Sequence, residues 1–269
     1  MVPDKMDAGL EWQIGVWDEI SDLYLREYAR RFAPVVDAVM VRAKIKPGDV
    51  VLDLGTGTGA LALRAARATG PKGRVVGLDI SPDMLQLAER TAATAGLKNI
   101  ELCEGRTEAI PAQDSSFDVV LASLSLMYVI DRAAAAREIV RVLKRGGCFV
   151  GAVWAEPDKC DIVRFQQTAG SFAPEPPVPD VGPGSMADPD LFVKQLAAAG
   201  LTARVETQEL GFEFDTFESA WEVLAGVTTS RLDPKRKDEA KDAVRQLMWQ
   251  QPDEPRYFRN LTRFIVANV

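Results

Sequence analysis

The chain has 269 residues, 47% of them apolar and 26% charged, and a formal net charge of −7. This length suits one large domain or a core domain with a substantial addition. The composition excludes a disordered chain, which combines low hydrophobicity with high charge. The negative net charge argues against broad electrostatic binding to nucleic acid, because such binding needs a basic face that displaces counterions.

Histidine is absent from the sequence, and only three cysteines are present. The lack of imidazole excludes histidine-ligated metals, Ser-His and Cys-His nucleophilic systems and the most common general base at neutral pH. Cys103, Cys148 and Cys160 have no metal-ligand spacing and are too few for a disulfide scaffold, so we expect a cytoplasmic protein without a metal site. The N-terminus has no apolar signal core, and no apolar run reaches the roughly 20 residues of a membrane-spanning helix.

Short apolar runs alternate with helical patterns over the first 155 residues. Residues 10–44 repeat apolar side chains near every 3.6 positions, which predicts a helical N-terminal segment. Turn signals and caps then separate five buried strands from three helices. The expected strands are Val50–Leu54, Arg74–Leu78, Ile100–Cys103, Phe117–Ser123 and Cys148–Trp154, and the expected helices are 60–68, 82–95 and 131–143.

The pattern changes after Trp154. Residues 173–189 are rich in proline and predict a rigid loop, and a helix follows from Asp188-Pro189 to Gly200. A strand over 202–214, two helices within about 216–250 and a final strand over 260–269 complete the chain. Strands spaced by helices imply right-handed crossovers. The expected fold is α/β: a Rossmann-like doubly wound sheet, mostly parallel with an antiparallel last strand, and helical additions that form a lid.

A glycine-rich loop joins the first strand to its helix. Gly55, Gly57 and Gly59 lack Cβ atoms, so the backbone can turn sharply and lie close to a ligand. The N-terminal end of the helix offers free N–H groups to a carboxylate or a phosphate. Asp79 ends the second strand, where an acid can accept both hydroxyls of a ribose.

Two classes of cofactor fit this loop. Gly55, Gly57 and Ala60 satisfy the relaxed dinucleotide fingerprint, so an NAD(P)-dependent oxidoreductase is one hypothesis. Asp53 favours the other class, because a pyrophosphate gains nothing from a nearby carboxylate, whereas the ammonium and sulfonium groups of S-adenosylmethionine do. The alternative role for Asp53 is to order the loop.

Four motifs occur in order along the chain: Val50–Ala60, Gly77–Met84, Ser116–Val120 and Arg141–Gly147. Together they resemble the class I S-adenosylmethionine-dependent methyltransferases, specifically the ubiquinone/menaquinone-biosynthesis-type group known as type 11. The resemblance covers about residues 30–155, and the stretch from Gly182 to Gly200 also looks like a later region of that group.

The resemblance implies cofactor contacts by position. Asp53 would hold the ammonium group, the glycine loop would hold the methionine portion, and Asp79 would bind the ribose. Ile80 or Met84 would pack on adenine, although Met84 is equally well placed as a core residue of its helix. The expected cofactor-binding residues are Asp53, Gly55, Thr56, Gly57, Gly59, Asp79, Ile80, Met84, Arg106, Thr107 and Ser123.

Two positions depart from the family pattern. Family members often carry Gly-Asp-Ala-Glu where this chain has Gly105-Arg-Thr-Glu108, and that aspartate contacts the amino group of adenine. Because a guanidinium has donors only, we expect adenine to rely on backbone groups at Arg106 and Thr107. The family's Leu-His-His-Val is replaced by Leu126-Met-Tyr-Val129, which excludes a mechanism through that histidine.

Methyl transfer is an in-line displacement, in which proximity supplies about 7–11 kcal/mol of barrier reduction in favourable cases. An enolate, a phenolate or an amine therefore needs no strong base. Ser123 and Tyr128 are the predicted catalytic residues, since they follow the fourth strand at the carboxyl edge where open α/β sheets bind ligands. The other candidates at the reactive end, for which hydrophobic packing is the alternative, are Trp17, Tyr24, Ser125 and Trp154.

The sequence thus predicts an enzyme that methylates a small or medium organic acceptor at carbon, oxygen or nitrogen. A protein that binds S-adenosylmethionine in a non-methylating or regulatory role is the alternative. One domain is expected over 1–269, with a cofactor-binding core at about 40–155, lid segments at about 1–40 and 156–255, and the final strand at 260–269. Side chains that would line the acceptor pocket, or simply pack in the core, are Phe192, Phe212, Phe214 and Trp221.

Overall fold

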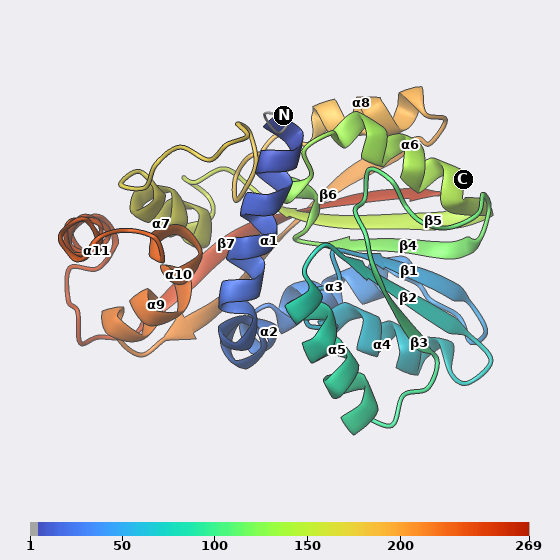
Figure 1. Cartoon of the computed structure of the whole chain (residues 1–269), viewed down its shortest axis with the longest axis horizontal. Helices are drawn as coiled ribbons and strands as arrows, with labels where there is room; N and C mark the ends of the chain where they lie inside the picture. Colours follow the sequence, from blue (N-terminus) through green and yellow to red (C-terminus); the bar gives the residue numbers. More distant parts are fainter. Residues whose placement is uncertain (1–4, 269) are drawn as a thin grey trace.

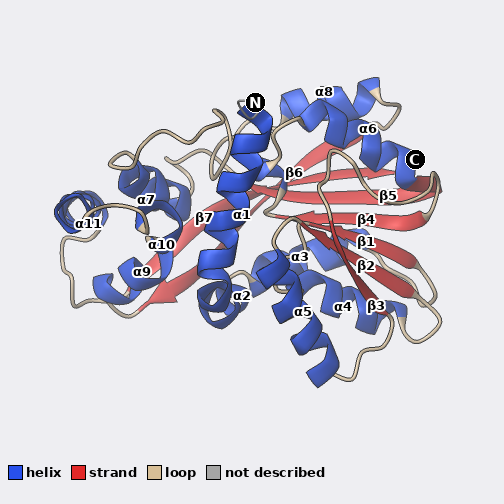
Figure 2. Ribbon diagram, viewed as in Figure 1, coloured by secondary structure: helices blue, strands red, loops and turns tan. Residues whose placement is uncertain are grey.

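The computed structural model describes residues 5–268, and within this range seven strands form one sheet. The strands are β1 Val50–Leu54, β2 Arg74–Asp79, β3 Ile100–Glu104, β4 Phe117–Ser123, β5 Leu143–Trp154, β6 Ala203–Phe214 and β7 Arg256–Asn268. Their spatial order is β3-β2-β1-β4-β5-β7-β6. Figure 2 shows the sheet nearly edge-on, with helices on both faces.

The sheet is parallel except at one strand. β1 pairs in parallel with β2 and β4, and these pair in parallel with β3 and β5, whereas β7 runs antiparallel to both β5 and β6. The predicted fold class is therefore confirmed. The chain order reverses between β1 and β4, so the crevice at their carboxyl ends is the expected ligand position in a sheet of this kind.

Helices cover the two faces of the sheet, and a further group lies beyond it (Figure 1). α3, α4 and α5 lie on one face, and α6 and α8 lie on the other. The bounds are α3 Ala33–Ala43, α4 Ala60–Thr69, α5 Pro82–Thr94, α6 Arg132–Val142 and α8 Asp190–Ala198. No helix within residues 5–268 combines the length and apolarity needed to cross a membrane.

The N-terminal segment is helical, as predicted, but irregular. It comprises α1 Lys5–Leu23, a π-helical turn at Tyr24–Tyr28 and a short α2 at Ala29–Arg31. Figure 1 shows α1 crossing the edge of the sheet, and α1 packs against α5 and α10 (Gly226–Thr229). π-Helical turns inside α-helices are frequent at functional sites.

The remaining helices gather around the outer ends of β6 and β7. They are α7 Asp161–Gly170, α9 Phe217–Leu224, α10 and α11 Pro234–Met248. Two helices were predicted within about 216–250. The structure has three there: α9, the four-residue α10 and α11. α7 was not predicted, because a buried amide from the distant strand β7 helps to define its first turn.

Two predicted boundaries are wrong. The chain enters β5 at Leu143, so α6 ends at Val142, and Gly146-Gly147 lies inside the strand instead of stopping the helix. The register of β5 against β4 shifts here, between Phe117 and Val119. β7 begins at Arg256, before the predicted start, and the predicted last residue lies outside the described residues.

Asn260 joins α7 to the sheet and provides a test of this part of the fold. Its side chain is 1% exposed; Oδ1 accepts a hydrogen bond from the Ile162 N–H at 2.9 Å, and Nδ2 donates to the Phe258 carbonyl at 3.3 Å. Asn260→Ala leaves a buried donor unpaired, so we expect a loss of about 1–3 kcal/mol in the free energy of unfolding. Urea denaturation measures it.

The matched control is Asn268→Ala, at the exposed end of the same strand. This substitution should change the free energy of unfolding by no more than about 0.5 kcal/mol. Equal losses for the two variants would contradict the role assigned to Asn260.

Candidate functional site

The glycine loop after β1 has backbone torsion angles that residues with a Cβ atom rarely adopt. Gly55 and Gly57 have φ values of +65° and +54°, in the left-handed region. A Cβ on Gly55 would lie 2.4 Å from the Cβ of Ser125, so the loop packs directly on the segment after β4. Gly59, also left-handed at +85°, starts α4.

Asp79, at the end of β2, connects this loop to α5. One carboxylate oxygen accepts a hydrogen bond from the Gly57 N–H at 2.7 Å, and the other accepts one from the Ser81 N–H at 3.0 Å. Ser81 in turn caps α5, since its hydroxyl accepts a hydrogen bond from the Met84 N–H at 3.1 Å. A carboxylate has about four acceptor positions, so Asp79 retains capacity toward a ligand.

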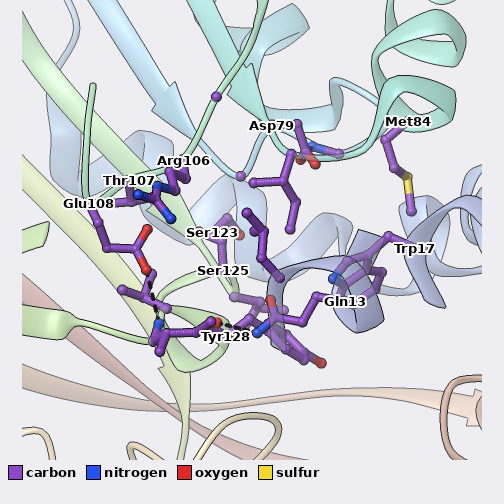
Figure 3. A pocket seen from close by; sticks show the side chains of 18 of the residues that line it. Gln13, Trp17, Asp79, Met84, Arg106, Thr107, Glu108, Ser123, Ser125 and Tyr128 are labelled. Atoms are coloured by element: carbon purple, nitrogen blue, oxygen red, sulfur yellow. Dashed lines mark hydrogen bonds between the residues drawn. The ribbon is translucent and has the colours of Figure 1, made fainter. Parts of the chain in front are cut away.

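A cavity at the carboxyl edge, here called the binding cavity, collects most of the predicted site residues (Figure 3). Its walls come from α1, the glycine loop, the end of β2, the segment after β3 and the segment after β4. The predicted residues that line it are Gly55, Gly57, Asp79, Ile80, Met84, Arg106, Thr107, Ser123 and Tyr128, joined by the other candidates Trp17, Tyr24 and Ser125.

Three predicted residues do not line the binding cavity. Asp53 and Thr56 line a narrow space behind the glycine loop, which shares Gly55 and Ser123 with the binding cavity. Thr56 donates a hydrogen bond from its hydroxyl to one oxygen of Asp53 at 2.7 Å. Gly59 lines neither space and instead forms the left-handed turn into α4.

Sequence reasoning missed two polar residues of the wall. Gln13 on α1 is 4% exposed and donates a hydrogen bond from Nε2 to the Tyr128 carbonyl at 3.0 Å. Glu108 accepts a hydrogen bond from the Ile130 N–H at 3.1 Å. Figure 3 shows both bonds as dashed lines. Glu108 lies in the Gly105–Glu108 segment, where the chain departs from the family pattern. Gln13 reaches the cavity wall only because α1 lies over the carboxyl edge of the sheet.

Two buried carboxylates give the site its electrostatic character. Burial raises the pKa of Asp53 to about 7, with the bond from Thr56 opposing this shift and the Asp79 charge adding to it. Burial also raises the pKa of Asp79, against the backbone donors of Ser81 and Gly57. The second oxygen of Asp53 is buried and has no hydrogen-bond partner within residues 5–268.

This carboxylate pair decides which cofactor the residues fit. A buried carboxylate without a cation is costly, and a ligand ammonium group supplies both the charge and the hydrogen-bond donors that it lacks. A pyrophosphate would instead add negative charge beside Asp53 and Asp79. The two carboxylate acceptors and the glycine loop therefore fit S-adenosylmethionine and not a dinucleotide.

The aromatic residues at the far end of the binding cavity form one cluster. The ring of Trp17 lies edge-on to Tyr128 at 4.8 Å and to Tyr24 at 6.1 Å, measured between ring centroids. Burial raises the pKa of the Tyr24 and Tyr128 hydroxyls above the usual value. Both phenols are therefore neutral near pH 7, so neither is present there as a phenolate base.

Of the four side chains considered for the acceptor pocket, three lie in the hydrophobic core and the partly buried Phe212 packs against it; none of them lines the binding cavity. Phe192 packs near Phe149, with ring centroids 6.4 Å apart, and Phe212 stacks on Phe258 at 5.8 Å. Phe214 and Trp221 are 1% and 6% exposed. Core packing, the alternative considered for these side chains, is what the structure shows.

Comparison with known proteins agrees with this geometry. Residues 45–169 match a family model described as a methyltransferase domain. A demethylmenaquinone methyltransferase of Geobacillus kaustophilus is 35% identical over 146 residues, which cover 53% of this chain and 62% of that protein. A ubiquinone/menaquinone biosynthesis C-methyltransferase of Hahella chejuensis is 37% identical over 117 residues, covering 43% and 47%. The chain thus spans about half the length of these curated relatives.

Solved structures share the fold. The YcgJ protein of Bacillus subtilis aligns with a TM-score of 0.62 at 21% identity, over 87% of this chain and 97% of that one. A SAM-dependent methyltransferase of Aquifex aeolicus aligns with a TM-score of 0.53 at 16% identity, covering 87% and 89%. At these identities the likeness concerns the fold alone.

The sheet order is that of the methyltransferase fold found in these solved structures, and the glycine loop and the two buried acids lie together at the carboxyl edge of its parallel strands. The chain contains a methyltransferase domain and has relatives among the quinone-biosynthesis methyltransferases. The family resemblance stated from the sequence motifs is confirmed.

An ammonium contact at Asp53, as the family resemblance implies, predicts that cofactor binding depends on pH. A bound ammonium group favours the charged carboxylate, so binding below pH 7 must expel a proton from Asp53. We expect the affinity for S-adenosylhomocysteine to rise up to tenfold per pH unit below about 7 and to level off above it. Calorimetry from pH 5.5 to 8.5 measures this profile.

Asp53→Asn is the matched variant, because the amide keeps an acceptor for Thr56 but cannot ionise. It should bind more weakly at pH 8 and show no rise between pH 5.5 and 7. If the affinity of Asp53→Asn for S-adenosylhomocysteine rose as steeply with pH as that of the unmodified protein, a group other than Asp53 would be the one that titrates.

Proposed function

We propose that this protein transfers the methyl group of S-adenosylmethionine to a small or medium organic acceptor at a carbon, oxygen or nitrogen atom. The observation that carries the proposal is the pair of buried carboxylates, Asp53 and Asp79, beside a glycine loop and without a cationic partner in the described chain. The methyltransferase domain and the names of the relatives support it.

In this proposal the nucleoside part of the cofactor lies along the wall of the binding cavity, and its methionine portion reaches past Gly55 and Ser123 toward the narrow space that Asp53 and Thr56 line. Asp53 holds the ammonium group, the glycine loop with Thr56 holds the methionine portion, and Asp79 accepts hydrogen bonds from the ribose hydroxyls. Residues proposed for the adenine end are Ile80, Met84, Arg106 and Thr107, and Ser123 faces the reactive end.

When bound, S-adenosylmethionine would supply a methyl group on a positively charged sulfur: the acceptor's electron pair would take the carbon, the carbon–sulfur pair would stay on sulfur to give S-adenosylhomocysteine, and a proton carried by the acceptor atom would leave to solvent. The chain's contribution is to align the two partners, to exclude water and to place aromatic rings beside the positive charge.

Ser123 and Tyr128 remain the proposed catalytic residues. Ser123 is the last residue of β4 and lines both the binding cavity and the narrow space behind the glycine loop. Tyr128 lines the binding cavity, and its carbonyl is fixed by Gln13. Because the Tyr128 phenol stays neutral, we assign it the positioning of the acceptor by hydrogen bonding, with no role as a base.

Binding and turnover distinguish this proposal from its alternatives. We expect calorimetry to detect S-adenosylhomocysteine binding and no NADPH binding. With S-adenosylmethionine and an acceptor panel that includes reduced naphthoquinones, we expect S-adenosylhomocysteine to form. Binding without product across the panel would favour the non-methylating role, and NADPH binding alone would favour an oxidoreductase. The cytoplasmic location and the single-domain division stay predictions.

Asp79→Ala tests the proposed ribose site. The substitution removes the ribose acceptor and also frees the Gly57 and Ser81 N–H groups, so we expect the affinity for S-adenosylhomocysteine to fall at least 100-fold, since hydrogen bonds to charged groups contribute about 1.5–3 kcal/mol each. Calorimetry measures the change. Asp83→Ala, at an exposed carboxylate in the first turn of α5, is the control and should retain affinity. Retained affinity in Asp79→Ala would refute the assignment.

A further inference from the structure

Glu108 is a carboxylate on the wall of the binding cavity that the proposed cofactor contacts leave unused. One of its oxygens accepts hydrogen bonds from the Ile130 N–H at 3.1 Å and from the Asp131 N–H at 3.4 Å. Both donors are backbone groups, so they fix the orientation of the carboxylate. The second oxygen has no hydrogen-bond or ion-pair partner among residues 5–268, and Figure 3 draws it without a bond. Glu108 therefore keeps an acceptor oxygen for a ligand.

The order of the strands places Glu108 at one end of the cofactor. In S-adenosylmethionine the ribose joins methionine to adenine, and the proposed ribose acceptor, Asp79, is the last residue of β2. β2 lies between β3 and β1, and the loop after β1 is proposed to hold the methionine portion. Adenine therefore extends toward the segment after β3, which runs from Gly105 to Glu108. This segment borders the ribose acceptor directly, because the Gly105 N–H donates to the Asp79 carbonyl at 2.9 Å.

The segment after β3 presents one carboxylate among hydrogen-bond donors. The Arg106 guanidinium has donors only, and its carbonyl already accepts from the Ala109 N–H at 3.1 Å. The Thr107 N–H has no hydrogen-bond partner in the part of the chain that the structure describes. Two consecutive residues of the cavity wall thus offer a free N–H donor, from Thr107, and a free carboxylate oxygen, from Glu108.

Adenine carries the matching pair of groups on its edge. Its 6-amino group donates, and the ring nitrogen beside it accepts. In hypoxanthine a carbonyl replaces the amino group, and the ring nitrogen next to it carries a hydrogen. A carbonyl that faces the carboxylate of Glu108 leaves two acceptors without a donor, which is costly inside a cavity. A carboxylate at this position therefore distinguishes the two bases.

We propose that Glu108 selects the adenine base of the cofactor, by accepting a hydrogen bond from the 6-amino group on the oxygen that Ile130 and Asp131 leave free. The proposal rests on the proposed function, whose cofactor it assumes. It adds a side-chain acceptor to the backbone groups of Arg106 and Thr107 that were expected from the sequence. Glu108 is a specificity-determining residue for cofactor binding and takes no part in methyl transfer.

S-adenosylhomocysteine and S-inosylhomocysteine test the proposal, because they differ only at the 6-position of the base and in the hydrogen on the adjacent ring nitrogen. Calorimetry on the full chain measures both affinities. We expect S-adenosylhomocysteine to bind at least tenfold more tightly, which is the effect of one hydrogen bond to a charged group. Equal affinities in the unmodified protein overturn the proposal.

Glu108→Gln is the diagnostic variant. Its amide oxygen keeps the bonds from the Ile130 and Asp131 N–H groups, because an NH2 group cannot accept them, so the NH2 group faces the base. We expect the preference for S-adenosylhomocysteine to fall at least tenfold, with S-inosylhomocysteine bound as tightly as before or more tightly. A merely structural role of Glu108 weakens both ligands alike, so an unchanged ratio of affinities contradicts the proposal.

Two further variants locate the effect. Glu104→Gln, at the exposed glutamate that ends β3, is the matched control and should leave both affinities unchanged. Arg106→Gln removes the neighbouring positive charge and should keep the preference for adenine, whatever its effect on overall affinity. If Arg106→Gln abolished the preference and Glu108→Gln retained it, Arg106 would select the base and the proposal would be wrong.

Failure of this proposal is distinguishable from failure of the proposed function. An unmodified protein that does not bind S-adenosylhomocysteine refutes the proposed function. Tight binding of S-adenosylhomocysteine together with equally tight binding of S-inosylhomocysteine refutes only the role of Glu108. This comparison uses the unmodified protein, so it holds even where a variant at position 108 fails to fold.

Discussion

The carboxylate of Asp79 is the contact on which the rest of the site depends. It accepts hydrogen bonds from the glycine loop and from the first turn of α5, so a single side chain fixes the end of β2, the turn after β1 and the start of a helix. A buried carboxylate with only backbone donors is held by dipoles and not by an opposite charge, and its pKa rises. Asp53 is also buried without an opposite charge, but its hydrogen bond comes from the Thr56 hydroxyl and its second oxygen has no partner among the described residues. Together the two carboxylates favour a cation.

The N-terminal helix closes this space from the other side. Gln13 donates to the Tyr128 carbonyl, the Ser81 hydroxyl donates to Asp18 at 2.5 Å, and Tyr28 reaches the lid helix α9 through Val223. These contacts hold α1 beside the aromatic residues at the far end of the binding cavity. The polar half of the site thus belongs to the carboxyl edge of the sheet, and the aromatic half lies beside the N-terminal helix.

The sequence predicted the sheet core well because its signals are local. Apolar runs, the Ser81-Pro82 helix start and the glycine loop each act within a few residues, and the structure has these elements where they were expected. α7 was missed because its first turn depends on Asn260, 98 residues away from Ile162. The end of α6 was misplaced because pairing with β4 extended β5 back to Leu143.

What the sequence alone determined is the class of site: a loop with Gly55 and Gly57, flanked by the acids Asp53 and Asp79, follows from residue types at fixed spacing. Only the tertiary structure decided which aromatic side chains line the binding cavity. Trp17 and Tyr128 come from distant segments and meet at 4.8 Å, whereas Phe192 and Trp221, equally plausible by composition, pack in the core. The reason is physical: backbone geometry is encoded locally, but the face that a helix presents is set by what it packs against.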